Sequence, residues 1–454
     1  MTVTTEELQR EQNGGVSATT AAVRAPSAEQ PAASPESAHA AAVAVSGIAD
    51  IDDERGFLRV AGYRRSPGDI PLTPAHVRQY GLRKGDQITG TAAARGGGTH
   101  APGGNGTNTG NGASSGAKNG TSTGNGASSG AKNGTRTRAR NGASAGSDGM
   151  TLVSVATING MPPQVAKGRR RFDDLTPVYP NQRFRLEDGD SSPTARIIDL
   201  LSPIGKGQRG LIVAPPKAGK TMVLKTIAHA IASAYPDTHL MLVLVGERPE
   251  EVTDLRRSVR GEVVASTFDQ SPDDHVRAAE LAIARAKRLA ELGRDVVVLL
   301  DSLTRLGRAY NLAAPVSSRT LTGGVAASAL QPPRQFLGAA RCLEEGGSVT
   351  IVSTALIDTG SQLDTVLFEE FKGTGNMELR LRRDLAEKRI FPAIDVAPSG
   401  TRREDLLMEP AEHAAVVTLR RALAALDSQH AIELLLDKTS APNAEFLRQI
   451  RQSS

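Results

Sequence analysis

APPKAGKT, at residues 214–221, is the segment from which the architecture of this chain is best inferred. It follows the apolar run LIV at 211–213 and precedes the helical pattern MVLKTIA at 222–228. A strand, a turn and a helix in this order are the context of a phosphate-binding loop, because the N–H groups at a helix start point at the anion. We expect Lys220 to reach the β- and γ-phosphates of a nucleotide and Thr221 to hold a magnesium ion. An ordinary strand–turn–helix with a chance Gly-Lys-Thr is the alternative.

Two further apolar runs end in a carboxylate. The run LMLVLV at 240–245 leads through a glycine to Glu247, and the run VVVLL at 296–300 leads to Asp301. Open parallel α/β sheets place their functional groups at the carboxyl ends of strands. We therefore expect Glu247 to polarise the attacking water and Asp301 to complete the magnesium shell. Either carboxylate alone could merely cap the next helix, but together with the phosphate loop they indicate ATP hydrolysis.

Phosphoryl transfer also requires a cation at the developing charge, often an arginine from a neighbouring subunit. Arg389, Arg402 and Arg403 lie downstream of both carboxylates and are candidates. Composition alone favours the alternative, in which these are surface arginines without a catalytic role.

The composition of the chain indicates in which cellular compartment we expect the protein. The chain has 454 residues and a net charge of +5, which permits a polyanionic partner without requiring one. Its single cysteine, Cys342, excludes an internal disulfide, in keeping with a reducing cytosol. Apolar runs are too short for a membrane span, and the N-terminus lacks the pattern of a signal peptide. We expect a cytoplasmic protein without a membrane partner.

The pattern of the chain predicts four regions. Residues 1–46, rich in Ala, Ser, Pro, Glu and Thr, are expected to be disordered. Short strand-like runs with Gly-rich turns at 47–160 indicate a small β-barrel, interrupted at 95–148. A linker at 161–195 follows. From 196 to 454, apolar strands alternate with helices, which is typical of an α/β fold with a parallel sheet.

The interruption at 95–148 is low in complexity. The unit GNGASSGAKNGT begins at Gly110 and recurs at Gly124, and no acidic residue occurs between Arg95 and Ser147. Such a segment is flexible and positively charged. It could act as a tethered arm that attracts RNA or as a segment prone to self-association. A passive linker is an equally good interpretation.

Several motifs resemble those of the transcription termination factor Rho family over about residues 172–450. They are SPIGKGQRG at 202–210, ERPEEVT at 247–253, DSLTR at 301–305, LTGGV at 321–325 and EEFKGTGN at 369–376. The resemblance implies a homohexameric, RecA-like ATPase that uses ATP and Mg²⁺ to move along single-stranded RNA. It also implies transcript release from RNA polymerase, together with elongation factors. The barrel matches more loosely, as an OB-like RNA-binding domain.

The resemblance also implies roles for individual residues. The residues expected to contact the nucleotide are Lys217, Ala218, Gly219, Lys220, Thr221, Met222 and Arg248, and Phe391 is expected to stack on adenine. Thr221 and Asp301 are expected to bind magnesium. The expected catalytic residues are Lys220, Glu247 and Asp301, together with Arg402 as the arginine finger and Arg389 as a second arginine that crosses between subunits. In the barrel, Phe57 and Arg59 are expected to contact RNA. In the core, RNA is expected to contact two pore loops: a first at 315–326, through Arg319, Thr322, Gly323 and Gly324, and a second at 358–362, through Thr359, Gly360 and Ser361.

The sequence departs from the family in both halves. Gln362 stands where many members have a lysine, and Gly246 replaces the usual aspartate before Glu247. In the barrel only Phe57 remains of the RNA-stacking aromatics, and the other positions hold Arg55, Pro71 and Gly149. Because stacking contributes about 1–3 kcal/mol per base, we expect a weakened barrel site. Nearby arginines could compensate electrostatically: Arg55, Arg59, Arg64 and Arg65.

Three functions therefore compete. The first is an active Rho-type motor that terminates transcription. The second is an RNA-binding regulator with weak motor activity, suggested by Gln362 and by the aromatic-poor barrel. The third is another RecA-like ATPase, which the barrel and the Gly-rich pore loop disfavour.

Overall fold

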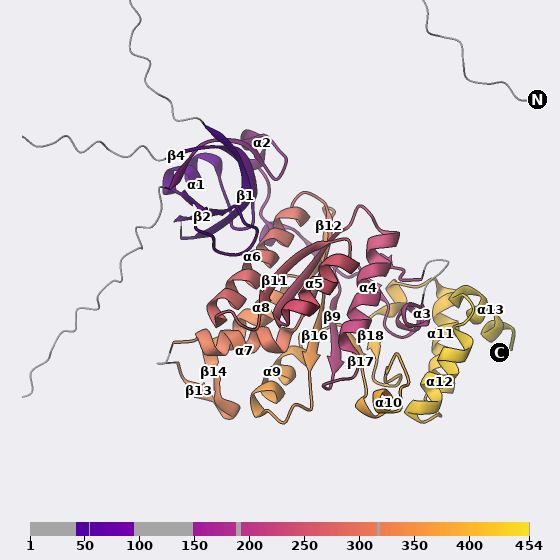
Figure 1. Cartoon of the computed structure of the whole chain (residues 1–454). Coiled ribbons are helices and arrows are strands. Elements are labelled where there is room, and N and C mark those ends of the chain that lie inside the picture. Colours follow the sequence, from indigo (N-terminus) through magenta and orange to yellow (C-terminus); the bar gives the residue numbers. More distant parts are fainter. Residues whose placement is uncertain (1–41, 54, 95–148, 188–191, 316–317, 454) are drawn as a thin grey trace, which may run out of the picture. The chain divides into compact units, whose positions relative to one another are not determined.

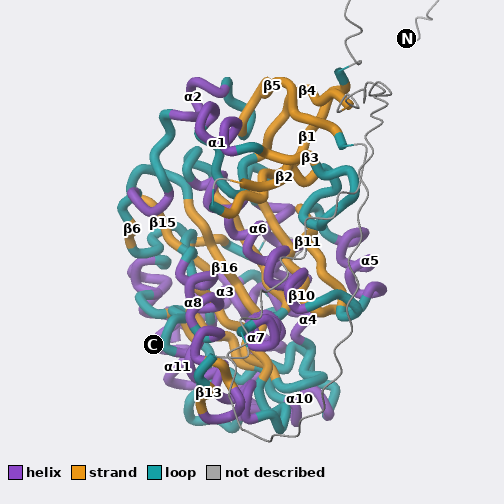
Figure 2. The backbone as a smooth tube through the Cα atoms, turned by 90° about the vertical axis from the view of Figure 1, so that its left-hand side faces the viewer, coloured by secondary structure: helices purple, strands orange, loops and turns teal. Residues whose placement is uncertain are grey.

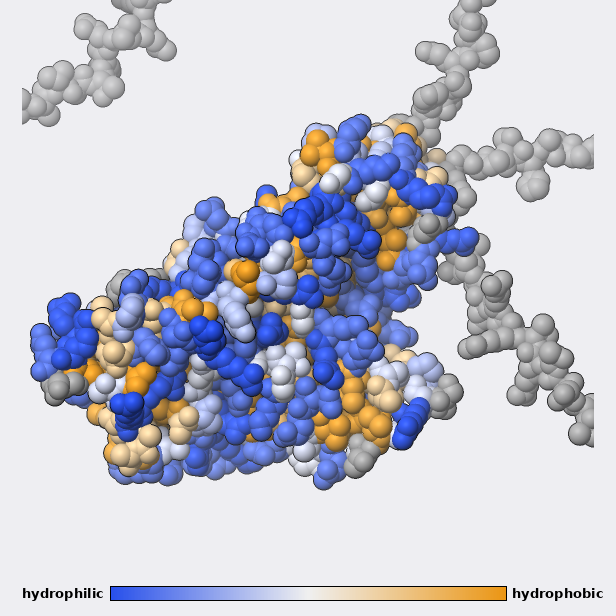
Figure 3. Space-filling model, turned by 180° about the vertical axis from the view of Figure 1, so that it is seen from behind, coloured by the Kyte–Doolittle hydropathy of each residue, from blue (hydrophilic) through white to orange (hydrophobic). Residues whose placement is uncertain are grey.

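The computed structural model describes residues 42–53, 55–94, 149–187, 192–315 and 318–453. These residues belong to one unit of the chain, Ala40–Ser454. Most of the predicted N-terminal disordered segment and the whole of the 95–148 insert lie outside the described residues. Among the described ones, no helix combines the length and the apolar character that crossing a bilayer requires, and the face drawn in Figure 3 is largely hydrophilic.

The N-terminal part is a five-stranded antiparallel barrel with strand order β3-β2-β1-β4-β5 (Figure 1). Its elements are β1 (Val43–Asp52), β2 (Arg55–Arg59), β3 (Ile70–Leu72), α1 (Pro74–Tyr80), β4 (Gln87–Ala94) and β5 (Met150–Ile158). Alternate residues of these strands, such as Leu58, Ile88 and Ile158, are fully buried and fill its interior. A short barrel with few strands fits the short apolar runs that the sequence shows.

The two sides of the insert belong to neighbouring strands. β5 pairs antiparallel with β4, with Ala94 opposite Met150 and Ile88 opposite Ile158. A strand therefore resumes after the insert, as the sequence predicts, and continues the sheet as the neighbour of β4. β1 starts at Val43, four residues earlier than the expected barrel start. Its first residues pair with β4, Val43 opposite Ala92, and such long-range pairing leaves no mark in composition.

The segment between barrel and core is ordered over 161–187. It contains α2 (Pro163–Lys167), the 3-10 helix Phe172–Asp174, β6 (Pro177–Val178) and β7 (Arg183–Phe184). Phe172 is fully buried, and β6 pairs with a strand of the core sheet. Burial of an aromatic ring contributes strongly to packing, so this segment is part of the folded unit.

The core is a mostly parallel sheet with order β11-β10-β12-β16-β9-β17-β18. The strands on this path are β9 (Arg209–Ala214), β10 (His239–Glu247), β11 (Glu262–Thr267), β12 (Asp295–Asp301), β16 (Ser348–Leu356), β17 (Met377–Arg380) and β18 (Gly400–Thr401). Off this path, β15 (Arg341–Leu343) pairs antiparallel with β16 and with β6. β8 (Ile204–Gly205) pairs with β7, and β13 and β14 form a hairpin introduced below. Only β18 runs antiparallel on this path. The alternation of strand and helix predicted this α/β architecture correctly.

Helices cover both faces of the sheet (Figures 1 and 2). One hydrophobic cluster joins the sheet to α3 (Pro193–Leu201), α4 (Lys220–Ala234), α5 (Pro249–Ser258), α11 (Pro410–Leu423), α12 (Ser428–Lys438) and α13 (Asn443–Ser453). The other joins it to α6 (Pro272–Ala290), α7 (Leu303–Ala313), α8 (Gln331–Gly338) and α9 (Gln362–Lys372). Alternate residues of β12 enter the two clusters: Val297 and Leu299 the first, Val298 and Leu300 the second. A short helix, α10 (Arg383–Glu387), precedes β18.

Candidate functional site

The phosphate-loop candidate connects β9 to α4. Gly219 has the left-handed backbone conformation, φ +92°, immediately before the first helical residue, Lys220. The turn therefore requires a residue without a Cβ, and the first N–H groups of α4 point out of the helix start. Lys217 and Met222 are exposed, whereas Ala218 is buried beneath the loop. This is the anion-binding geometry that the sequence predicts.

The ammonium group of Lys220 lies between the two predicted carboxylates. Its Nζ is 2.8 Å from both oxygens of Asp301 and 3.3 Å from Oε1 of Glu247. Burial alone would lower the pKa of Lys220, but the two carboxylates outweigh it and raise that pKa. Three residues from three different segments thus converge at the carboxyl ends of β9, β10 and β12.

Glu247 is turned into the site by an irregularity in β10. The register between β10 and β11 shifts between Val245 and Glu247, and Gly246 between them has φ +67°. A residue with a Cβ is strained in that conformation, which gives the Gly246 departure a structural reason. Burial, followed by the nearby charge of Asp301, raises the pKa of Glu247 to about 7. Among the predicted catalytic groups, Glu247 therefore changes charge near neutral pH.

Asp301 is held by a neighbouring strand. The hydroxyl of Thr354, in β16, donates to Oδ1 of Asp301 at 2.7 Å, and the carboxylate is almost completely buried. The next residue, Ser302, caps α7 through its side chain, which accepts from the N–H of Arg305. Asp301 therefore does not cap α7. Capping of the next helix was the alternative role that its position at the end of a strand allowed.

The sequence interpretation missed two residues of this site. Arg305 lies within ion-pair distance of Glu247, with Nε 3.3 Å from Oε1, and donates to the carbonyl of Gly246. Thr354 supports Asp301 as described. Arg305 belongs to the DSLTR motif, in which an arginine four residues after a strand-end carboxylate falls on the first turn of the next helix. Thr354 has a weaker signal, a polar residue near the end of an apolar strand.

Phe391 lies beside the phosphate-loop candidate. A Cβ atom placed on Gly219 would be 3.6 Å from two carbons of the Phe391 ring, and the ring is about one-third exposed at 37%. Arg248, also predicted in this pocket, is exposed at the start of α5 and pairs with Glu251. An exposed ring edge next to the loop is available for a flat ligand.

The predicted subunit-crossing arginines lie at the surface. Arg389 and Arg402 are exposed. Arg402 follows β18, which is the last strand at its edge of the sheet and is separated from β16 by β17 and β9. Within the described residues, neither guanidinium forms a side-chain hydrogen bond or an ion pair. Among the described residues, neither arginine therefore takes part in the Lys220–Glu247–Asp301 cluster of its own chain.

The two predicted pore loops lie against each other. The first forms a hairpin from β13 (Thr320–Leu321), a 3-10 turn Thr322–Gly324 and β14 (Val325–Ala326). Its Gly323 has φ +80°, and a Cβ there would be 3.2 Å from the backbone oxygen of Gln362 in the second loop. Arg319 and Gly360 are exposed, and Ser361 directly precedes α9. Residues 316 and 317 of the first loop lie outside the described residues.

Helix α7 contacts both loops. Asn311 donates to the carbonyl of Gly324 at 3.2 Å and accepts from the N–H of Ala326 at 2.7 Å. One turn earlier, Arg308 forms a two-point ion pair with Asp364, with both N–O distances 2.7 Å. The same carboxylate accepts from the hydroxyl of Thr359 in the second loop at 2.6 Å. The helix that begins next to Asp301 thus ends in direct contact with the predicted RNA loops.

The barrel corrects one predicted RNA contact. Arg59 is buried, with its Nη1 2.6 Å from Asp69 and its Nε 2.9 Å from Asp50. Two carboxylates neutralise its charge, so it cannot serve as the exposed RNA cation that the sequence suggested. It does lie 5.2 Å from the ring centre of Phe57, which is 44% exposed. Arg59 therefore supports the aromatic platform from below.

Two other arginines of the barrel also differ in their surroundings. Arg64 donates to the carbonyl of Ala265 in β11, so it ties the barrel to the core. Arg55 is exposed near Phe57 on β2. Pro71, which stands where an aromatic was expected, lies opposite Phe57 in the register of β2 and β3. Phe57 and Arg55 are thus exposed together on β2, and Arg65 is exposed in the loop that follows this strand.

Comparisons with known proteins agree with these two halves. The model of the ATP synthase alpha/beta family, nucleotide-binding domain, matches residues 194–401, and that of the Rho termination factor, RNA-binding domain, matches residues 45–101. A transcription termination factor Rho from Micrococcus luteus is 52% identical over 90% of this chain and 54% of its own length. The corresponding protein from Streptomyces lividans is 53% identical over 91% of this chain and 52% of its own length.

The chain thus spans about half the length of those two curated relatives. Another relative, a transcription termination factor Rho from Streptosporangium roseum, is 50% identical, and the match covers 90% of this chain and 93% of the relative. Identity at that level, over nearly the whole of both sequences, shows that this chain belongs to the transcription termination factor Rho family.

Proposed function

We propose that this protein is an ATP-driven RNA translocase that terminates transcription by releasing RNA from RNA polymerase. The observation that carries the proposal is the convergence of Lys220, Glu247 and Asp301 behind a phosphate loop, with α7 connecting that site to two loops. The barrel captures single-stranded RNA, and the parallel-sheet core from residue 196 onward performs hydrolysis and translocation. Family membership supports RNA polymerase and elongation factors as partners.

The residues present fit a nucleotide with Mg²⁺. In the structure Lys220 occupies the space between two carboxylates, where an ammonium balances charge that a metal would balance in the loaded site. With nucleotide bound, Lys220 would contact the phosphates, and Thr221 and Asp301 would hold the metal, whose charge would offset that of the phosphates. Lys217, Ala218, Gly219, Met222 and Arg248 would border the phosphates and Phe391 the base, an assignment that the loop geometry and the exposed ring support.

Glu247 orients the attacking water. Its side chain lies at the end of β10, beside Lys220 and Arg305. A carboxylate in this position accepts a hydrogen bond from water and aligns the oxygen for in-line attack. Arg305 keeps the carboxylate oriented and is a positioning residue in this mechanism.

Hydrolysis requires a second subunit. Arg402 and Arg389 are exposed and form no ion pair with the carboxylates around Lys220 among the described residues, which suits arginines that reach the site of a neighbour in a homohexamer. An arginine supplied in trans stabilises the charge of the transition state. The proposal therefore predicts that ATP turnover depends on assembly.

RNA binding and hydrolysis are coupled through α7. Asp301 directly precedes this helix, Arg308 reaches the second loop through Asp364, and Asn311 holds the first loop. A rigid helix with contacts at both ends can convert a change at the nucleotide into a shift of the loops. Arg319, Thr322, Gly323 and Gly324 in the first loop and Thr359, Gly360 and Ser361 in the second contact RNA in this scheme.

ATP hydrolysis by the purified full chain tests the proposal, measured alone, with poly(C) and with single-stranded DNA of equal length. We expect strong stimulation by RNA only. Stimulation by both nucleic acids would instead favour another RecA-like ATPase. ATP binding without RNA stimulation would favour a regulator with weak motor activity, the alternative that the exposed Gln362 and the aromatic-poor barrel support.

A further inference from the structure

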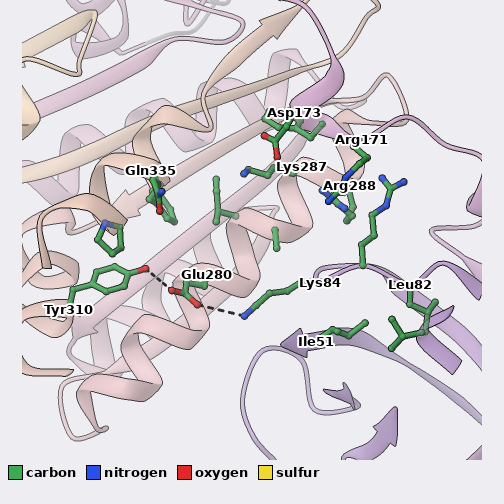
Figure 4. Close-up of a pocket in the computed structure, with 17 residues that line it drawn as sticks. Ile51, Leu82, Lys84, Arg171, Asp173, Glu280, Lys287, Arg288, Tyr310 and Gln335 are labelled. Atoms are coloured by element: carbon green, nitrogen blue, oxygen red, sulfur yellow. Dashed lines mark hydrogen bonds and ion pairs between the residues drawn. The ribbon is translucent and has the colours of Figure 1, made fainter. Parts of the chain in front are cut away.

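A cavity of about 570 Å³ lies where the barrel meets the core, away from the phosphate loop (Figure 4). It is bordered by β1, by the segment after α1, by the 3-10 helix of the linker and by α6, α7 and α8. Its volume is in the range of pockets that hold small organic ligands. Its apolar wall consists of Ile51, Val77, Leu82, Phe172, Ile283 and Phe336.

One end of the cavity is cationic. Arg171, Lys287 and Arg288 point toward it, together with one carboxylate, Asp173 (Figure 4). Arg288 pairs with Glu291 at 2.9 Å, yet its Nε is buried without a hydrogen-bond partner. Three cations therefore face one carboxylate, which leaves an excess of positive charge at this end.

Lys287 is a partly buried cation of this end that lacks an ion-pair partner among the described residues. Its ammonium lies 5.4 Å from the ring centre of Phe172, and among the described residues it forms no ion pair with a carboxylate. Burial, together with the charges of Arg288 and Arg341, lowers the pKa of Lys287 against the opposing effect of Asp173. An anion in the cavity would relieve the cost of keeping this ammonium charged.

The opposite end carries the hydroxyl of Tyr310 and a carboxylate, Glu280, whose charge is offset by Lys84. The hydroxyl of Tyr310 donates to Glu280 at 3.1 Å, and Lys84 lies 3.6 Å from the other oxygen of that carboxylate. Gln335 borders the same end (Figure 4). These groups offer donors and acceptors to a polar, uncharged part of a ligand. An apolar wall separates them from the cationic end.

We propose that this cavity is a second nucleotide site, which takes a free nucleoside phosphate. The phosphates meet Lys287, Arg171 and the guanidinium of Arg288, the base lies along the apolar wall, and its polar edge faces Tyr310, Glu280 and Gln335. Because the walls come from both barrel and core, an occupied site joins the two. Tyr310 lies on α7, so occupancy also reaches the helix that connects the nucleotide site to the RNA loops.

Equilibrium dialysis of labelled ADP against the full chain tests the proposal by stoichiometry. Wild-type protein is expected to bind two ADP molecules per chain. Lys220→Ala should remove the phosphate-loop class and leave the second class intact. Lys287→Met keeps the apolar stem but removes the ammonium, so it should weaken the second class by about tenfold or more and leave the first unchanged.

Two controls make the outcome decisive. Lys438→Met removes an exposed lysine that pairs with Asp437 far from the cavity, and it should leave both classes unchanged. Tyr310→Phe, which removes only a hydroxyl, should weaken the second class by a smaller factor and guards against misfolding of the lysine variant. One ADP per wild-type chain, lost entirely in Lys220→Ala, would overturn the proposal. So would an effect of Lys287→Met on RNA binding alone, with no second class of ADP.

Discussion

The core and the barrel hold their predicted functional side chains in opposite ways. In the core, Glu247 and Asp301 are 4% and 1% exposed and share one ammonium group. In the barrel, Phe57 is 44% exposed, and the arginine beneath it is already paired with carboxylates. Interactions in a buried, interlocked site are strong because the local dielectric is low. We therefore expect single changes in the core to act steeply, and changes on the barrel to act gradually and to depend on salt.

Removing the shared ammonium should give the largest effect. Lys220→Ala leaves two buried carboxylates without their cation and the phosphates without their lysine, so ATP turnover should fall by on the order of 10²–10³-fold or more. RNA binding by the barrel should stay unchanged, as measured by filter binding without ATP. Lys225→Ala, on the same helix but paired at the surface with Asp254, is the matched control. Hydrolysis at the wild-type rate in Lys220→Ala would show that the site is wrongly placed.

The raised pKa of Glu247 predicts a specific dependence on pH. The carboxylate form orients water, and with a pKa of about 7 this form is lost as pH falls through neutrality. The value of kcat/KM for ATP, which reports the free enzyme, should therefore rise with pH and level off above about 8. Glu247→Gln should lower turnover by about 10²-fold and abolish this rise. A wild-type profile that is flat between pH 6 and 8 would contradict the assigned role.

Sequence and structure agree best where local pattern sets the geometry. The phosphate loop and both strand-end carboxylates could be placed from sequence because each apolar run ends at one edge of a parallel sheet. Arg305 and Thr354 could not, because their contacts depend on helix orientation and strand register. From sequence, Gly246 suggested a change in the polarity of the nucleotide pocket. In the structure, Gly246 has a left-handed backbone conformation, and the chain there turns Glu247 into the site. Arg59 suggested a free cation because its partners, Asp50 and Asp69, come from other strands or loops.

The barrel side of the comparison is tested by Phe57→Ala. Stacking on one ring contributes about 1–3 kcal/mol per base, so RNA affinity should fall by about 5- to 150-fold. Fluorescence anisotropy with a short oligocytidine, without ATP, measures this loss. Val60→Ala, which shortens another exposed apolar side chain of the barrel, should have little effect. Equal affinities for wild type and Phe57→Ala would mean that RNA binds elsewhere on the barrel.

A change at α7 tests whether the two halves communicate. Arg308→Ala breaks the ion pair with Asp364 that holds the second loop, while leaving the phosphate loop intact. Basal ATP hydrolysis should persist, and the stimulation by poly(C) should drop by about tenfold, within the usual range of coupling energies. Arg334→Ala, which removes an exposed pair with Glu370, provides the comparison. Full stimulation in Arg308→Ala would place the coupling outside this helix.

The smallest effect is expected from the insert. Deleting residues 96–147 joins strands β4 and β5, which are already neighbours at Ala94 and Met150, so the barrel should stay folded. The deletion removes five lysines and arginines and no acidic residue. If the segment attracts RNA, affinity should fall a few-fold at low salt and little at high salt, because each phosphate contact adds to the salt slope by about 0.7 for a single strand. Filter binding across a salt series measures the slope. An unchanged slope would make the insert a passive linker and leave the barrel surface around Phe57 as the main RNA contact of the N-terminal half.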